Sequence, residues 1–71
     1  MKDEKIMKYV PKRLVGAIRE AYHDSDGYWI MLEDDYMDTH MNAHVIHGET
    51  INQLREDLQN VEKVGKNESN I

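Results

Sequence analysis

The chain has 71 residues, contains no cysteine and carries a formal net charge of −5 at pH 7. This length allows one small domain, and the lack of cysteine excludes disulfides and thiolate zinc sites. No apolar run is long enough for a membrane span or a signal-peptide core, so we expect a cytoplasmic protein with no membrane contact.

Charge is unevenly distributed along the chain. Residues 1–13 hold five of the nine Lys and Arg residues and two of the 14 acids, which gives this segment +3. The other 58 residues hold four cations and twelve acids, or −8. A body with this charge repels nucleic acid. It is therefore either a solvated acidic surface or a surface that fits a basic groove on another protein.

The first part of the chain gives weak signals. Residues 1–10 show no regular period, and we predict a mobile basic arm over residues 1–12. Its Tyr9-Val10-Pro11 stretch is expected to be extended, because the residue before a proline avoids the helical region. A single domain is predicted over residues 13–65. Residues 13–23 fit either a helix or a strand, and the turn that follows favours a strand.

A hairpin is predicted around Asp24-Ser25-Asp26-Gly27. This turn cluster is followed by the aromatic and β-branched run of residues 28–32. The hairpin places His23 opposite Tyr28 and Ala21 opposite Ile30. Alternation along the strand sends Tyr28 and Trp29 to opposite faces of the sheet.

The second half predicts a loop at residues 33–42, a third strand at 43–47 and a helix. Thr50 and Gln53 have the spacing of a capping box. The apolar residues at 51, 54, 58, 61 and 64 predict an amphipathic helix of about four turns that ends at Gly65, followed by a polar tail at 66–71. The fold class is therefore α+β (β-β-β-α), a three-stranded antiparallel sheet covered on one face by a C-terminal helix. The uncovered face is either wet or an interface, and homodimerisation is one use of it.

Four histidines form the candidate metal pool. If residues 37–47 were helical, the spacing of His40, His44 and His47 would place all three on one side, within reach of a zinc or nickel ion. Strand geometry would separate them. In that case His23, with Asp38 as a spare oxygen ligand, could complete a zinc site only if the loop folds back. The alternative is that all four are partly exposed structural histidines.

Catalytic chemistry has little support in the sequence. The serines and threonines lie in no nucleophile elbow, and there is no glycine-rich phosphate loop. The carboxylates at 33–35 lack the apolar surroundings that separate the pKa values of an acid–base pair. We expect no enzyme, no catalytic residues and no deep pocket.

Two runs carry a family resemblance: AYHDSDGYWI at residues 21–30 and HVIHGET at residues 44–50. The region 14–60 resembles short uncharacterised proteins of bacterial and phage mobile elements. The hairpin, helix entry and helix also resemble the HicB antitoxin core. However, too few residues follow the helix for the DNA-binding module that HicB proteins usually append. The small size and acidity are also similar to those of anti-CRISPR proteins, but this similarity is one of general type and no motif carries it.

These observations predict a non-enzymatic acidic binding protein that inhibits a nucleic-acid-handling partner. The most specific form is a phage-type inhibitor of a guide-RNA-directed nuclease, in which a histidine-bound zinc would order the acidic loop. The alternative is a HicB-like antitoxin fragment or a regulatory interaction module. The partner would be a protein with a basic nucleic-acid-binding surface. The expected contact residues are Trp29, Tyr28, Glu33, Asp34, Asp35 and Asp38.

Overall fold

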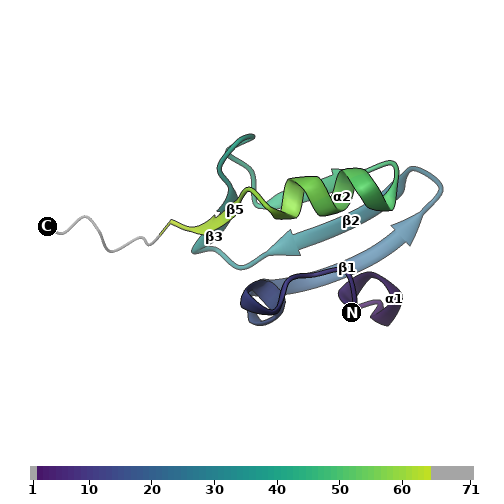
Figure 1. Ribbon diagram of the computed structural model, residues 1–71, viewed down its shortest axis with the longest axis horizontal. Helices are drawn as coiled ribbons and strands as arrows, with labels where there is room; N and C mark the ends of the chain where they lie inside the picture. Colours follow the sequence, from purple (N-terminus) through teal and green to yellow (C-terminus); the bar gives the residue numbers. More distant parts are fainter. Residues whose placement is uncertain (1, 65–71) are drawn as a thin grey trace, which may run out of the picture.

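The computed structural model describes residues 2–64 (Figure 1). Its fold is α+β, as predicted, with a three-stranded antiparallel sheet in the order β1-β2-β4 and a separate two-stranded sheet, β3-β5. The elements in chain order are α1 (Glu4–Met7), the 3-10 helix η1 (Lys12–Ala17), β1 (Ile18–Asp24), β2 (Gly27–Leu32), β3 (Tyr36–Asp38), β4 (Val45–Gly48), α2 (Ile51–Leu58) and β5 (Val61–Lys63).

The β1-β2 hairpin has the predicted register. His23 pairs with Tyr28 and Ala21 with Ile30, and the pairing continues to Asp24 and Gly27. Gly27 has a φ of 127°, a value that side chains rarely allow, and a Cβ there would lie 2.5 Å from the carbonyl oxygen of Gly48. The predicted third strand is present as β4, which pairs antiparallel with β2.

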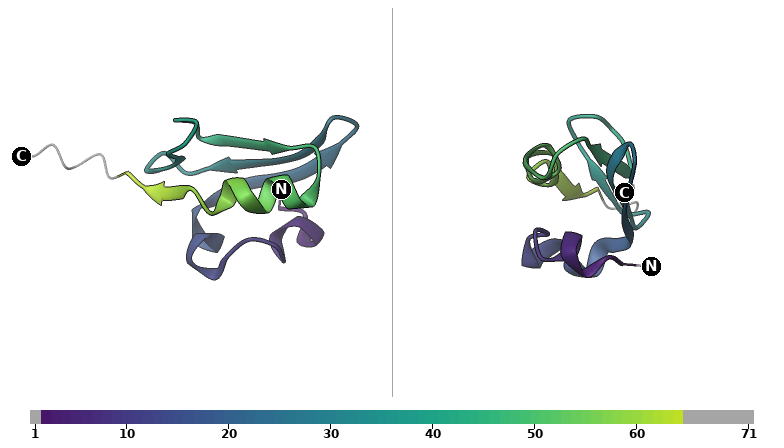
Figure 2. Two further views of the ribbon diagram at one scale, coloured as in Figure 1. Left: turned by 45° about the horizontal axis from the view of Figure 1, so that its top comes forward. Right: turned by 90° about the vertical axis from the view of Figure 1, so that its right-hand side faces the viewer.

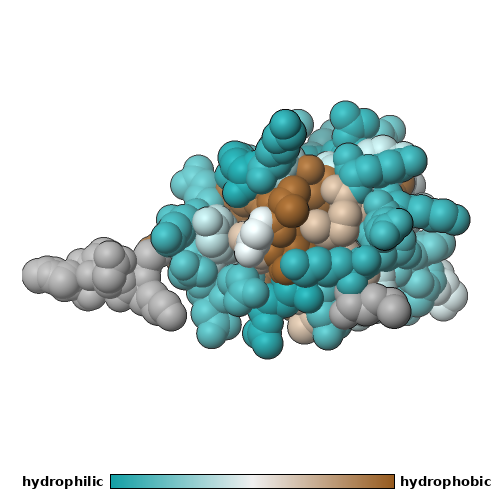
Figure 3. All heavy atoms as spheres, turned by 90° about the horizontal axis from the view of Figure 1, so that it is seen from below, coloured by the Kyte–Doolittle hydropathy of each residue, from teal (hydrophilic) through white to brown (hydrophobic). Residues whose placement is uncertain are grey.

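The N-terminal segment and α2 cover the same face of the three-stranded sheet (Figure 2). One hydrophobic core joins the segment, the sheet and the helix. The core side chains are at most 7% exposed: Ile6, Val10, Leu14, Ile18, Ala21, Ile30, Leu32, Ile46, Leu54, Leu58 and Val61. Figure 3 views the molecule from below Figure 1 and shows an apolar patch ringed by hydrophilic residues.

Residues 2–12, the described part of the segment predicted to be a mobile arm, pack against the sheet. The Asp3 side chain caps α1 by accepting a hydrogen bond from the backbone N–H of Lys5 (2.8 Å), and the backbone N–H of Asp3 donates to Ala21 on β1 (2.9 Å). Ile6 is 1% exposed. The segment is ordered because α2 is too short to cover the sheet alone, so these side chains complete the core.

The predicted four-turn helix is also wrong in its length. Thr50 caps α2 as predicted, since its hydroxyl accepts from the backbone N–H of Gln53 (3.2 Å), but the helix ends at Leu58. The chain then turns and Val61 begins β5, which pairs with β3 in the region expected to be a loop. Val61 is buried at the predicted spacing, but it reaches the core from a strand. Gly65 and the tail at 66–71 lie outside the described residues.

Candidate functional site

The face of the three-stranded sheet turned away from α2 carries the candidate site. Ala21, Ile30 and Ile46 point into the core, so their neighbours along the strands point the other way. Tyr22 is 40% exposed and Val45 39% exposed. We call this surface the open face, and it consists of Glu20, Tyr22, Trp29, Met31, Val45 and His47.

Three rings form a continuous row across the open face. Register places Tyr22 of β1 beside Trp29 of β2, and Trp29 beside His47 of β4. The ring centroids of Tyr22 and Trp29 are 6.2 Å apart with planes 14° from parallel, and those of Trp29 and His47 are 4.1 Å apart with planes 33° from parallel. Aromatic pairs at these separations stabilise one another. The three rings therefore hold one another in place across the open face.

The hairpin turn fixes the polar edges of this row. The indole Nε1–H of Trp29 donates to Oδ1 of Asp24 (3.0 Å), and His47 donates through Nε2–H to the carbonyl oxygen of Asp26 (2.7 Å). A carbonyl only accepts, so the proton on His47 lies on Nε2. Both rings are thus oriented by hydrogen bonds as well as by packing, and less conformational freedom would be lost on binding.

Acidic side chains lie beside the row and at the far end of β2. Hydrogen bonds from the Trp29 indole and from the backbone N–H of Asp26 lower the pKa of Asp24, which fixes a carboxylate at the hairpin end. Glu20 lies on the open face itself, and the exposed Glu33 and Asp34 follow β2. Within residues 2–64 the acids around this face form one ion pair, Arg19–Asp34 at 3.9 Å between exposed side chains. The surface is suited to a cationic partner.

The predicted contact residues do not all lie together. Trp29 is on the open face, whereas Tyr28 lies on the helix-covered face and stacks on His23, with centroids 4.3 Å apart. Alternation predicted this separation correctly. Glu33 and Asp34 are exposed, and Asp35 lies 3.9 Å from Lys63 on β5.

Asp38 was wrongly expected to be a surface contact, because its side chain is 0% exposed. Its Oδ1 accepts hydrogen bonds from the backbone N–H groups of His40 (2.9 Å) and Met41 (3.2 Å). Its Oδ2 has no partner among the described residues. Because the side chain is buried and bonded to the backbone of the following turn, Asp38 organises that turn and is not available to a partner.

The four histidines are spread over the molecule. Residues 37–47 contain strand and turn and no helix, so the spacing of His40, His44 and His47 does not gather them. His44 donates through Nδ1–H to the carbonyl oxygen of Tyr36 (2.6 Å), and His23 stacks on Tyr28. Between residues 2 and 64 no three His, Asp or Glu side chains converge as metal ligands. Zinc binding stays a prediction without a geometric basis in that region.

Sequence reasoning missed part of the open face. Tyr22, Met31, Val45 and His47 join Trp29 there, although none was predicted as a partner contact. The signal was available in the hairpin register, because every second residue of β2 has its cross-strand partners on the same face. The hairpin register could not identify Val45 and His47, because both lie on the third strand, whose register with β2 was not predicted.

The comparisons add no relatives. No family model, curated protein or solved structure matches the chain. The resemblances to mobile-element proteins and to the HicB core therefore stay predictions. Within the described part of the chain, no helix is long and apolar enough to cross a membrane.

Proposed function

We propose that the protein is a non-enzymatic docking module whose open face binds a basic surface on another protein. The observation that carries this proposal is the row of the exposed Tyr22 and the half-buried Trp29 and His47, of which the last two are oriented by the hairpin turn, with acids beside the row. Large aromatic side chains dominate binding energy at protein interfaces. Arginine side chains of a partner can stack on these rings and pair with the adjoining carboxylates.

The charge of the face argues against two other occupants. Proteins that stack nucleic-acid bases on aromatic rings combine the rings with a positively charged groove, whereas Glu20 and Asp24 border this row. A second copy of the chain bound through the same face would bring these acids near their own equivalents. A basic protein partner is therefore favoured over both nucleic acid and a homodimer.

The finer form of the proposal concerns what the partner does. Basic protein surfaces that accept a dense acidic ligand are commonly those that hold nucleic-acid phosphates. Occupying such a surface would inhibit a nucleic-acid-handling enzyme. A phage-type inhibitor of a guide-RNA-directed nuclease is the most specific member of this class. The body charge of −8 over residues 14–71 supports this partner chemistry.

The test compares two variants in their ability to retain partners from a host lysate. Tyr22→Ala/Trp29→Ala removes two rings of the row, and Tyr9→Ala removes an exposed ring that lies with Tyr28 and Ile51 on the helix-covered side of the sheet. We expect the double variant to lose at least about tenfold in affinity for the retained protein, as for an interface hot spot. Circular dichroism confirms that both variants are folded.

Three results together support the proposal. The protein retained by the wild type is also retained by the Tyr9→Ala variant, its binding weakens steeply as salt rises, and nucleic acid competes with the chain for it. A retained protein that binds the double variant equally well contradicts the proposal. So does binding that salt leaves unchanged. A retained small basic toxin would assign the same face to an antitoxin.

A further inference from the structure

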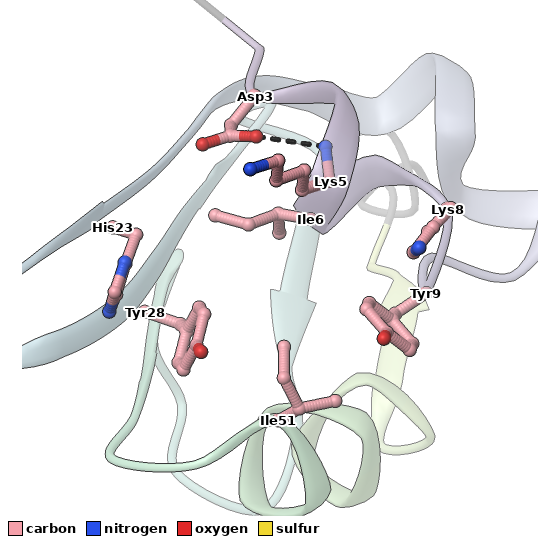
Figure 4. Close-up of a pocket in the computed structure, with 8 residues that line it drawn as sticks. All are labelled: Asp3, Lys5, Ile6, Lys8, Tyr9, His23, Tyr28 and Ile51. Atoms are coloured by element: carbon pink, nitrogen blue, oxygen red, sulfur yellow. Dashed lines mark hydrogen bonds between the residues drawn. The ribbon is translucent and has the colours of Figure 1, made fainter.

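A groove of about 300 Å³ lies between α1 and the start of α2, on the helix-covered side of the sheet (Figure 4). Ile6 of α1, Tyr9, Tyr28 of β2 and Ile51 of α2 line it. In Figure 4 the rings of Tyr9 and Tyr28 lie on opposite sides, with the two isoleucines between them. Ligand sites of this kind are concave and mostly apolar, with a few polar groups at defined places.

The two aromatic walls differ in their surroundings. The Tyr28 ring is stacked on His23 at a centroid distance of 4.3 Å and packs against the core, so that wall is fixed. The Tyr9 ring is 36% exposed and has two cations near it. The Nζ of Lys8 is 5.5 Å from its centroid, and the Cζ of Arg55 is 6.0 Å from it. A ring entering the groove would meet a fixed wall on one side and a positively charged wall on the other.

The rim of the groove is positive in an otherwise acidic chain. Lys5 and Lys8 line it and are exposed, against the single carboxylate of Asp3. Oδ1 of Asp3 already accepts a hydrogen bond from the backbone N–H of Lys5. An anion is attracted to this rim and repelled by the acids around the open face. The charge of the groove is therefore complementary to an anionic ligand.

We propose that this groove binds a planar aromatic ring that carries a phosphate, a ligand of mononucleotide size. The ring lies between Tyr9 and Tyr28 above the two isoleucines, and the phosphate meets the ammonium groups of Lys5 and Lys8. This site goes beyond the docking function proposed above and uses the other side of the sheet.

The experiment titrates the isotope-labelled protein with adenosine monophosphate, with adenosine and with ribose 5-phosphate, and follows amide signals by nuclear magnetic resonance. Adenosine monophosphate should shift the amides of Ile6, Tyr9 and Tyr28 and saturate. Adenosine should bind the same site about tenfold more weakly, because it lacks the charge-assisted contacts to the lysines. Ribose 5-phosphate, which lacks the ring, should not saturate.

Matched variants locate the binding. Lys5→Gln/Lys8→Gln should weaken adenosine monophosphate binding about tenfold and leave adenosine unchanged. Lys12→Gln, an exposed lysine of the same segment outside the groove, should bind as the wild type does. The proposal is overturned if adenosine monophosphate moves no groove amide at about 10 mM, if its shifts map to the open face, or if the lysine variant binds normally. Tyr22→Ala/Trp29→Ala should bind it normally, which separates this test from that of the docking function.

Discussion

At the scale of single residues, Asp38 is the most constrained acid in the described chain. Its Oδ1 receives two backbone N–H groups, and its Oδ2 is buried without a partner. Replacing Asp38 with Ala leaves both N–H groups without an acceptor, so the free energy of unfolding should fall by about 2 kcal/mol. Urea denaturation followed by circular dichroism measures this change.

The matched variant Asp38→Asn separates hydrogen bonding from charge. Asn keeps an oxygen for the N–H groups of His40 and Met41, and it replaces the unpartnered oxygen with an amide donor. We expect its stability to be at least that of the wild type. Equal loss in both variants would show that the turn depends on the carboxylate charge and not on its acceptor geometry.

At the scale of elements, the close approach of α2 to the end of β4 depends on Gly48. A Cβ at this position would lie 2.7 Å from the backbone nitrogen of Leu54 and 3.1 Å from the carbonyl oxygen of Thr50. Gly48→Ala should therefore push α2 off the sheet and lower the free energy of unfolding by about 1–3 kcal/mol. Gly16→Ala is the control, since a Cβ in η1 meets nothing within 4 Å. Thermal unfolding of both variants tests this account. Equal melting temperatures for Gly48→Ala and Gly16→Ala would contradict it.

The elements also show how far sequence reasoning reaches. The hairpin register and the cap at Thr50 could be predicted because they depend on local chemistry, an Asp-Gly turn and a hydroxyl three residues before Gln53. The end of α2 could not be predicted, because residues 51–64 keep the apolar spacing of a helix. In the structure Val61 is a strand residue, because it pairs with β3. Tertiary pairing overrode local periodicity there. Asp38 and Ile6 are both buried by residues distant in the sequence, so neither burial was evident from the neighbouring residues.

At the scale of the whole molecule, the two faces of the sheet have different chemistry. The open face joins an aromatic row to carboxylates, and the helix-covered side carries the lysine-rimmed groove of the N-terminal segment. The +3 charge of residues 1–13 therefore has a definite place in the fold, since Ile6 and Val10 anchor that segment to the core. An anion and a cationic protein surface would approach this molecule from different sides.

The pKa values of two carboxylates are shifted in opposite directions, so the two have opposite effects on how stability changes with pH. Burial, and then the charges of Asp38 and Glu56, raise the pKa of Asp57 above 3.8, so its cost to folding is present at neutral pH and disappears as pH falls to 3.8. Hydrogen bonds lower the pKa of Asp24, so its stabilisation persists below pH 3.8 and is lost only as pH falls through its folded-state value.

This asymmetry can be measured with Asp57→Asn and Asp24→Asn. At pH 7 the first should raise the free energy of unfolding by up to about 0.5 kcal/mol, and the second should lower it. In thermal melts taken at decreasing pH, the advantage of Asp57→Asn should shrink first, above pH 3.8. The deficit of Asp24→Asn should shrink only in stronger acid, because the hydrogen bonds to Trp29 and Asp26 hold that carboxylate in its charged form. If both differences closed over the same pH range, the contrast between the partly buried Asp57 and the hydrogen-bonded Asp24 would be wrong.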